Sequence, residues 1–353
     1  MALLEKNYNP LEHQFIVTDI GAKTKIDERF LKVFKIKEVS TFKLSDVKIV
    51  SSILKTDEFD KIMIHSLYLN YLLLALIFNK KVLSKATLML WGGSDARKFK
   101  VGEENKKYVL LAFFYEQLRK TVYKNVNTIA SIVPGDYESV KKTYKTRARY
   151  QLCKYAVPTS DNLFNKNDYI REDNEKKMYL QVGHSGSPDG DVLESLEILS
   201  KFKDCNLEVF SPLAYGNDEY IAKVIERGNK LFGDHFHPIV ELMNGEAFSK
   251  FIMEMDGLVL NTKIQQGLGN IYSYCYAEKK VFLSENGFLW QYFNNEGYDF
   301  NSIEKISEQN FNELQSVNKV QIKTNYEASK KFFDDKELIV IWNDIFCGGK
   351  NNE

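Results

Sequence analysis

The sequence contains few cysteines and few prolines, four and six in 353 residues. The cysteines are Cys153, Cys205, Cys275 and Cys347, and none of them forms a C-x-x-C pair. This spacing argues against a structural zinc site and against a disulfide framework. It fits a protein of the reducing cytoplasm.

Long hydrophobic segments are also missing. The most apolar stretch, Leu67–Phe78, is too short to span a bilayer and contains Asn70, so we expect a buried helix there. Residues 1–9 lack the apolar core of a signal peptide. The overall composition, 44% hydrophobic and 27% charged, is that of a soluble globular protein.

The formal net charge is zero, but the two signs are segregated along the chain. Residues 1–155 hold 28 Lys and Arg against 16 Asp and Glu, and the remaining residues carry the opposite excess. A basic half indicates an anionic partner. A nucleic acid, an anionic membrane face and a phosphorylated acceptor all satisfy this pattern, and so does a solvated surface with a chance imbalance.

Apolar strand-like runs alternate with amphipathic helical stretches, a pattern typical of α/β units with parallel sheets. The length favours two domains. We predict an N-terminal Rossmann-like domain over residues 1–157, a polar linker over 158–177, a second Rossmann-like domain over 178–325, and a long helix over 326–353 that returns to the first domain. Strands are expected at 14–18, 48–50, 61–64, 87–91, 128–133, 178–182, 207–210, 257–260 and 281–283.

Glycine and short polar residues cluster where predicted strands of the second half end, which is where open α/β sheets bind ligands. Two of these turns also begin a helix, so glycine, backbone N–H groups and the helix dipole can hold a phosphate there. An ordinary strand-to-helix turn is the alternative for the first turn. The candidate donor-binding residues are Gly183, His184, Ser185, Gly186, Tyr215, Asn217, Asn261, Gln265, Gln266, Gly267, Gly269 and Asn270.

Two candidates for catalysis, Asp95 and His65, and one for phosphate contact, Arg97, lie at predicted strand ends in the basic half. Asp95 can act as a general base toward a substrate hydroxyl, and Arg97 can contact phosphate oxygens. Asp95 fits an N-cap equally well. His65 ends its strand and is either a second candidate base or a structural residue.

Asp189-Gly190-Asp191 matches the DxD pattern that binds a divalent metal in one class of glycosyltransferases. It precedes a predicted helix, where Asp caps N–H groups, so we interpret it as a cap and expect no metal and no cofactor.

Residues 98–154 combine 13 basic and 5 acidic residues with many aromatic ones. Such a mixture suits a membrane interface and an anionic lipid head group. It would also suit RNA, but the sequence has no RNP-like or helix-turn-helix signature. The aromatic residues are Phe99, Tyr108, Phe113, Phe114, Tyr115, Tyr123, Tyr144, Tyr150 and the adjacent Tyr155.

These motifs together resemble a family, the transferases that add N-acetylfucosamine (a 4-acetamido-4,6-dideoxygalactose) to lipid II of enterobacterial common antigen. The resemblance covers about residues 60 to 295 in order and spacing. It rests on His65 with its apolar helix, on 91–95 (WGGSD), 182–186 (VGHSG), 212–217 (PLAYGN) with Tyr220, 265–269 (QQGLG) and 288–291 (FLWQ).

The resemblance implies a GT-B fold, inversion at the anomeric carbon, a dTDP-linked donor and a polyprenyl-diphosphate acceptor. We leave a UDP-sugar open as the alternative donor. It further implies synthesis of a surface polysaccharide such as O-antigen, by an enzyme peripheral on the cytoplasmic face of the membrane. Two features depart from the family. Residues 1–4 match the inside of its first helix, so the family's first strand is not expected here, and either the N-terminal domain is shortened or the start of the chain is misassigned. The segment from Asp95 to Lys98 lacks an aromatic residue, which implies a different acceptor preference.

The hypothesis is a single displacement with two open alternatives. The donor diphosphate is held by backbone groups of 183–186 and 265–270, the base moiety meets 239–244, and Asp95 or His65 deprotonates the acceptor. A shortened N-terminal domain would instead suit a non-catalytic sugar-nucleotide-binding or partner-stabilising subunit. A third reading is an adaptor that binds RNA or a membrane surface through the basic half.

Overall fold

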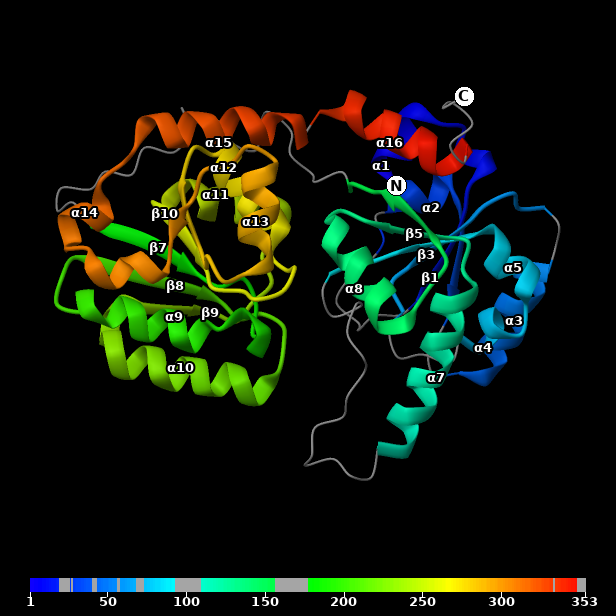
Figure 1. Ribbon diagram of the computed structural model, residues 1–353, viewed down its shortest axis with the longest axis horizontal. Helices are drawn as coiled ribbons and strands as arrows, with labels where there is room; N and C mark the ends of the chain where they lie inside the picture. The colour runs from blue at the N-terminus through cyan, green and yellow to red at the C-terminus, as the bar shows by residue number, and fades with distance from the viewer. Residues whose placement is uncertain are drawn as a thin grey trace. The chain divides into compact units, whose positions relative to one another are not determined.

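The computed structural model describes residues 1–18, 26, 28–39, 43–55, 58–67, 73–92, 109–155, 177–332 and 334–347. The chain divides into two compact units, Met1–Ala156 with Asp335–Glu353, and Val157–Asp334. Figure 1 shows both units as sheets covered by helices. None of the described helices is long and apolar enough to cross a bilayer.

The first unit contains a four-stranded parallel sheet of order β3-β4-β5-β6 and a separate parallel pair, β1 and β2. Its strands are β1 (Gln14–Thr18), β2 (Lys35–Val39), β3 (Ile62–His65), β4 (Ala86–Met89), β5 (Thr128–Ser131) and β6 (Arg149–Leu152). Its helices are α1 (Ala2–Asn7), α2 (Glu28–Val33), α3 (Leu44–Lys55), α4 (Leu73–Ile77), α5 (Lys80–Lys85), α7 (Val109–Asn125), α8 (Pro134–Tyr144) and α16 (Asp335–Cys347).

The second unit contains one six-stranded sheet, parallel throughout, of order β12-β11-β10-β7-β8-β9. Its strands are β7 (Met178–Val182), β8 (Leu207–Pro212), β9 (Phe236–Ile239), β10 (Gly257–Leu260), β11 (Lys280–Leu283) and β12 (Asn301–Ser302). Its helices are α9 (Val192–Leu199), α10 (Asp218–Phe232), α11 (Gly245–Glu254), α12 (Leu268–Tyr276), α13 (Phe288–Asn295), α14 (Phe311–Gln315) and α15 (Lys319–Phe332). Helices α9 and α10 cover one face, and α12, α13 and α15 cover the other (Figure 1).

The order of the six strands is that of doubly wound nucleotide-binding sheets, in which the first and fourth strands are neighbours. Here those strands are β7 and β10, which pair from Gly257 opposite Leu180 to Val259 opposite Val182. The connections from β7 and β10 leave in opposite directions, so their carboxyl ends form the topological switch point.

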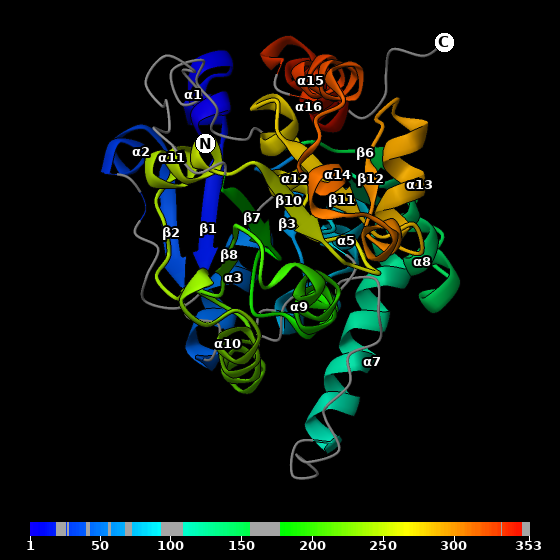
Figure 2. The same cartoon turned by 90° about the vertical axis from the view of Figure 1, so that its left-hand side faces the viewer.

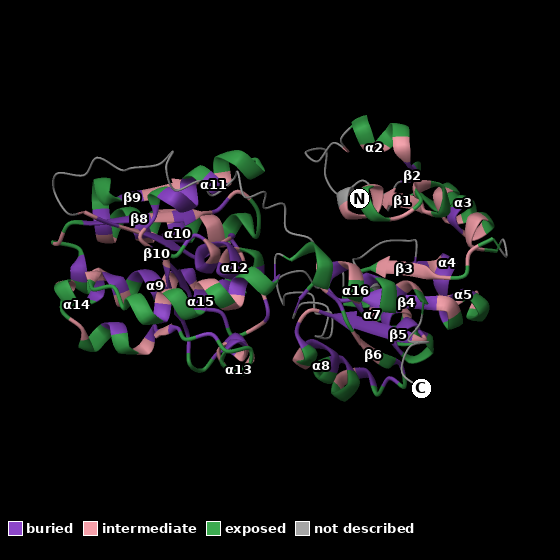
Figure 3. Cartoon of the chain, turned by 90° about the horizontal axis from the view of Figure 1, so that it is seen from above, coloured by how far each residue is buried: buried purple, intermediate pink, exposed green. Residues whose placement is uncertain are grey.

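Local sequence explains why these elements form where they do. Strand β7 is an almost continuous apolar run because both of its faces are covered, as parallel sheets require. Helix α10 begins where the Asn217 side chain accepts from the Tyr220 N–H and ends at Gly233, which has a φ of +56°. Figure 3 shows the result: central strands are buried and the outer faces of the helices are exposed.

Two expectations about secondary structure are wrong. Residues 48–50 belong to helix α3 and not to a strand, because Val47, Val50 and Leu54 recur at helical spacing and face the core. Within the predicted long helix over 326–353, the described residues belong to two helices, α15 and α16, in different units. Helix α16 packs on the first unit, where the Trp342 indole N–H donates to the Lys154 carbonyl at 3.0 Å.

Candidate active site

The turn after β7 is shaped by close backbone approaches. Gly183 has a φ of +74°, and a Cβ on it would lie 2.6 Å from Cγ2 of Val192, so glycine lets α9 pack against the strand end. The Gly183 N–H donates to the Val259 carbonyl at 2.9 Å, and the Gly186 N–H donates to the Tyr215 carbonyl at 2.8 Å. The two glycines therefore set the path of the backbone, and the protein itself uses their N–H groups.

Gly216 completes this arrangement in the turn after β8. It forms an isolated parallel bridge with Gly186, and a Cβ on Gly216 would lie 2.4 Å from the Gly186 backbone. The described residues offer no hydrogen-bond partner to the backbone N–H groups of His184 and Ser185. These two amides, and not those of the glycines, are the donors available in this turn.

His184 lies at the centre of the switch point. Burial lowers the pKa of its imidazole to about 4, so the ring is neutral at pH 7. Its Nδ1 atom is buried without a partner among the described residues, and Nε2 lies 3.4 Å from Oγ of Ser185. A buried polar atom without a partner is costly, so this nitrogen is suited to a ligand.

The amino end of α12 lies over the same ring. Gly267, the N-cap residue, has a φ of +70°, and a Cβ on it would lie 3.3 Å from Nδ1 of His184. No side chain caps this helix. A Cβ on Gly269 would have no atom within 4 Å, so the space at the first turn is open. An uncapped helix amino end beside a neutral imidazole is suited to an anion.

The side-chain amides of Gln265, Gln266 and Asn270, next to this helix end, differ in their hydrogen bonds. Gln265 is buried, and its Oε1 atom has no partner among the described residues. Gln266 donates to Oγ1 of Thr262 at 2.9 Å, which holds the loop after β10. Asn270 accepts from Nε2 of Gln181 at 2.9 Å, which ties α12 to β7.

Three further predicted donor-binding residues lie on adjoining turns. Asn261 is buried at the end of β10, where it donates to Glu194 at 3.0 Å. The carbonyl of Asn217 is occupied by the cap of α10, which leaves its amide nitrogen. Tyr215 has an exposed side chain, and its pKa is raised by desolvation.

Asp191 occupies the N-cap position of α9, but the expectation that its side chain caps the helix is wrong. Its side chain caps no N–H group and instead pairs with Nζ of Lys263 at 3.1 Å. The pair raises the pKa of Lys263. Among the described residues no group of three His, Cys, Asp or Glu is arranged to hold a metal ion. Lys263 was not predicted, because a lysine in a polar loop carries no sequence signal of its contact.

Glu304 was not predicted either, because a glutamate in a polar segment carries no sequence signal of its contacts. It accepts from the hydroxyls of Ser284 and Ser302, at 2.6 and 3.1 Å, and from the backbone N–H of Glu285 at 3.0 Å. These hydrogen bonds outweigh the desolvation of the carboxylate and lower its pKa to about 2. Glu304 thus fixes the loop after β11, and a Cβ on Gly287 in this loop would lie 2.4 Å from the Thr262 carbonyl.

In the first unit the structure brings three predicted or neighbouring side chains together at the end of β3. Nδ1 of His65 lies 3.0 Å from the Tyr155 hydroxyl, and the Trp91 indole N–H donates to the same oxygen at 2.7 Å. Desolvation lowers the pKa of His65. Asp95 and Arg97 lie outside the described residues.

The basic and aromatic segment divides into a buried and an exposed part. Tyr115, Tyr123 and Tyr144 are core residues of the first unit, so they are not free for an interface. Phe113 and Phe114 are exposed. Phe99 and Tyr108 lie outside the described residues.

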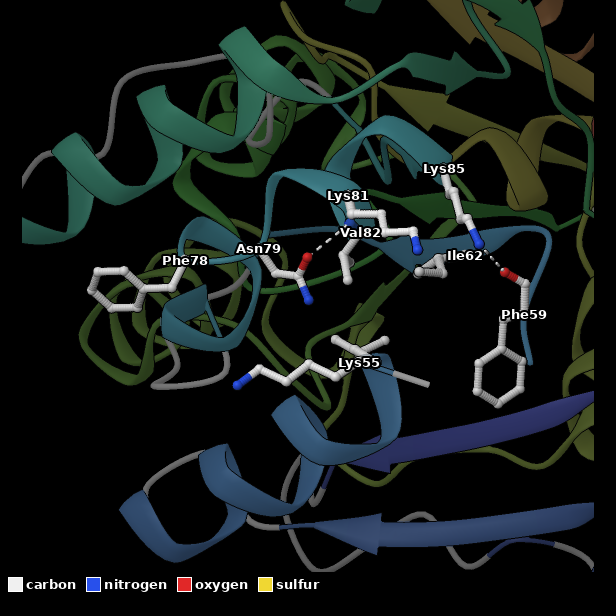
Figure 4. Close-up of a pocket in the computed structure, with 9 residues that line it drawn as sticks. Lys55, Phe59, Ile62, Phe78, Asn79, Lys81, Val82 and Lys85 are labelled. Atoms are coloured by element: carbon white, nitrogen blue, oxygen red, sulfur yellow. Dashed lines mark hydrogen bonds between the residues drawn. The ribbon is translucent and has the colours of Figure 1, made fainter. Parts of the chain in front are cut away.

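A shallow cavity of about 310 Å³ lies elsewhere in the first unit (Figure 4). It is lined by α3, α5 and the start of β3, at the amino ends of the strands and thus away from His65. Its polar lining includes Lys55, Asn79, Lys81 and Lys85, and the Lys85 ammonium donates to the Phe59 carbonyl at 3.0 Å.

Comparison with solved structures shows the same architecture. Anabaena HepE, solved with UDP and glucose, has a TM-score of 0.63 and 10% identity and covers 95% of this chain and 99% of its own. A Rickettsia africae glycosyltransferase has a TM-score of 0.63 and 14% identity, covering 97% and 91%. WaaG, a glycosyltransferase of lipopolysaccharide biosynthesis, has a TM-score of 0.61 and 14% identity, covering 99% and 94%.

These similarities confirm the GT-B fold expected from the sequence. No curated protein sequence matches the chain. A family model, described as 4-alpha-L-fucosyltransferase, glycosyl transferase group 56, matches residues 2–341. The chain therefore belongs to this fucosyltransferase family and is a glycosyltransferase of the GT-B type.

Proposed function

We propose that the enzyme moves a deoxyamino sugar from a dTDP- or UDP-linked donor to a saccharide carried on polyprenyl diphosphate. The transfer inverts the anomeric carbon, needs no metal and serves surface polysaccharide synthesis at the cytoplasmic face of the membrane. The observation that carries the proposal is the group of unsatisfied polar groups at the β7–β10 switch point, around the uncapped amino end of α12. Binding of UDP and UDP-glucose by HepE supports the same class of donor.

The donor diphosphate is assigned to the first turn of α12 and to the amides of His184 and Ser185. The second half of the chain is net acidic, so local N–H groups and a helix dipole must supply the positive potential. His184 contributes a neutral ring, which forms a hydrogen bond without adding charge. Gln265 offers its buried amide oxygen to a hydroxyl of the sugar or ribose.

The outer contacts complete the donor site in this proposal. Tyr215, the amide nitrogen of Asn217 and the end of β10 at Asn261 face the sugar or phosphates, and residues 239–244 contact the base moiety. The leaving diphosphate gains charge as the glycosidic bond breaks, and the N–H groups of α12 stabilise that charge in the transition state.

The reaction is a single displacement. The acceptor hydroxyl oxygen forms a bond to the anomeric carbon, the bond from that carbon to the diphosphate oxygen breaks, and its electron pair stays on the diphosphate. The hydroxyl proton passes to a protein base. Arg97 is assigned to the phosphates of the acceptor.

The contacts of His65 favour Asp95 as that base. The Trp91 N–H can only donate, so the Tyr155 oxygen accepts from it, and in this proposal the Tyr155 hydroxyl donates to Nδ1 of His65. A neutral imidazole that accepts at Nδ1 carries its proton at Nε2 and is a donor at that atom. His65 is then suited to orient the acceptor or bind its oxygens.

A thermal-shift screen of UDP, dTDP and GDP, free and linked to sugars, tests the donor assignment. A ligand present at about 100 times its dissociation constant stabilises the folded protein by about 2.7 kcal/mol. For a unit of this size that raises the melting temperature by about 5–10 °C. The proposal is wrong if no nucleoside diphosphate or its sugar shifts the melting temperature while the protein melts cooperatively.

A further inference from the structure

The first two turns of α7 expose an apolar surface. Val109, Leu110, Phe113 and Phe114 are exposed by 52%, 74%, 61% and 64%. Their spacing places them on one side of the helix. We refer to these four residues as the α7 tip. Figures 1 and 2 show this end of α7 projecting from the first unit.

The rest of α7 is firmly held, so the tip is a fixed projection. Val122 and Tyr123 are fully buried in the core of the first unit, and α7 packs against α4 and α5. The Tyr115 hydroxyl donates to the Leu67 carbonyl, which lies two residues beyond the end of β3. Val109 is six residues before Tyr115 and thus extends about 9 Å further along the helix axis. The α7 tip therefore lies up to about 9 Å further along the helix axis than the residue that contacts the segment after β3.

The charge along the exposed side of α7 is complementary to an anionic surface. Beyond the tip this side continues through Gln117, Lys120, Thr121 and Lys124, which are all exposed. The one carboxylate of the helix, Glu116, is mostly buried and pairs with Arg119 at 3.4 Å. Apolar residues followed by lysines are the pattern of segments that enter the head-group region of an anionic bilayer.

We propose that the α7 tip inserts into the surface of a membrane that contains anionic lipids. Lys120 lies about 10 Å along the axis from Phe113, so it reaches the lipid phosphates when the tip is in the acyl boundary. Docking in this way holds the first unit, which contains His65, at the bilayer surface. The inference rests on the proposed function, because an acceptor carried on a membrane lipid requires the enzyme to work at the membrane surface.

Co-sedimentation of the full chain with lipid vesicles tests the docking. Wild type is compared on vesicles of phosphatidylcholine alone and on vesicles with about 30 mol% phosphatidylglycerol, at low and high salt. Phe113→Ser with Phe114→Ser removes two insertable rings and is expected to weaken binding on the order of 100-fold. Lys120→Gln and Lys124→Gln are each expected to weaken binding to the anionic vesicles about fivefold and to reduce its salt dependence.

A matched control is Val340→Ser in α16, which removes a residue of the same unit that is 61% exposed. It should bind vesicles as wild type does. Equal binding by the double Phe variant and wild type would overturn the proposal, as would no binding by wild type. Light scattering without lipid tests whether the α7 tip instead binds a second copy of the chain. If wild type is a dimer and the double Phe variant is a monomer, the tip is a dimer interface and the membrane proposal is wrong.

The same samples separate this inference from the donor assignment. A protein that fails to bind vesicles but is still stabilised by a nucleoside diphosphate has a donor site without this docking surface. Vesicle binding without any nucleotide-dependent stabilisation would retain the docking surface and refute the donor site.

Discussion

Gly269 offers the most direct test of the donor site, because the structure leaves open space at this position of α12. A Cβ there meets nothing within 4 Å, so Gly269→Asp introduces a carboxylate without a clash. An acidic residue in the first turn of a helix is favourable by about 0.3–1 kcal/mol, so the fold should be unharmed. A carboxylate about 6 Å from one phosphoryl charge costs about 3 kcal/mol at an effective dielectric constant of about 20. The expected loss of donor affinity is therefore about 100-fold or more.

Isothermal titration calorimetry with the nucleotide identified by thermal shift measures this loss. Val320→Asp is the matched control, since it places the same carboxylate at the second residue of α15, where the side chain is exposed and lies away from the switch point. The control should bind donor as wild type does, and both variants should melt within a few degrees of it. A folded Gly269→Asp protein with unchanged affinity would refute the placement of the diphosphate at α12.

Four other predictions address the base, the metal, the imidazole and the backbone of the turn. Asp95→Asn should lower kcat by about 10²- to 10⁴-fold while His65→Ala stays within about tenfold of wild type, and the reverse pattern would make His65 the base. Turnover should persist in EDTA, whereas its loss would revive a metal-binding role for the DxD segment. Because the folded pKa of His184 is about 4 and its unfolded value about 6.5, only the unfolded chain binds the proton in this window. Wild type should therefore lose about 2 kcal/mol more than His184→Gln between pH 7 and pH 5 in denaturant titrations, and equal losses would contradict the burial of the ring. Gly216→Ala would put a Cβ 2.4 Å from the Gly186 backbone, so it should lower the free energy of unfolding by about 2 kcal/mol or more. It should also abolish the stabilisation by donor. Unchanged stability would show that the backbone of the turn can move to accept the Cβ.

Local sequence was informative wherever a short stretch decides its own structure. Strands β7 and β10 were predicted with the bounds they have, because a buried parallel strand is a short apolar run that ends in glycine or a polar residue. Helix α10 likewise has local start and stop signals, since Asn217 caps its start and Gly233 ends it.

Secondary structure differs from the sequence prediction where the hydrophobic pattern is ambiguous. Strands β2, β6 and β9 were missed because each contains polar residues and has no continuous apolar run. The boundary between α15 and α16 is indicated by the charges of the sequence. Basic residues at Lys330 and Lys331 end one helix and acidic residues at Asp335 and Glu337 begin the next, as the dipoles of two separate helices favour.

The sequence by itself determined the family, the two α/β halves and the loops that carry the candidate donor site, because strand ends and glycine turns are local features. Only the tertiary structure decided what each residue does within those loops. Gly186 meets Gly216 across two turns, His184 is buried beneath α12 with an unpaired nitrogen, and Tyr155 reaches His65 across 90 residues. Such contacts join segments distant in the chain, and a pKa depends on the burial that those contacts create, so no pattern of neighbouring residues records them.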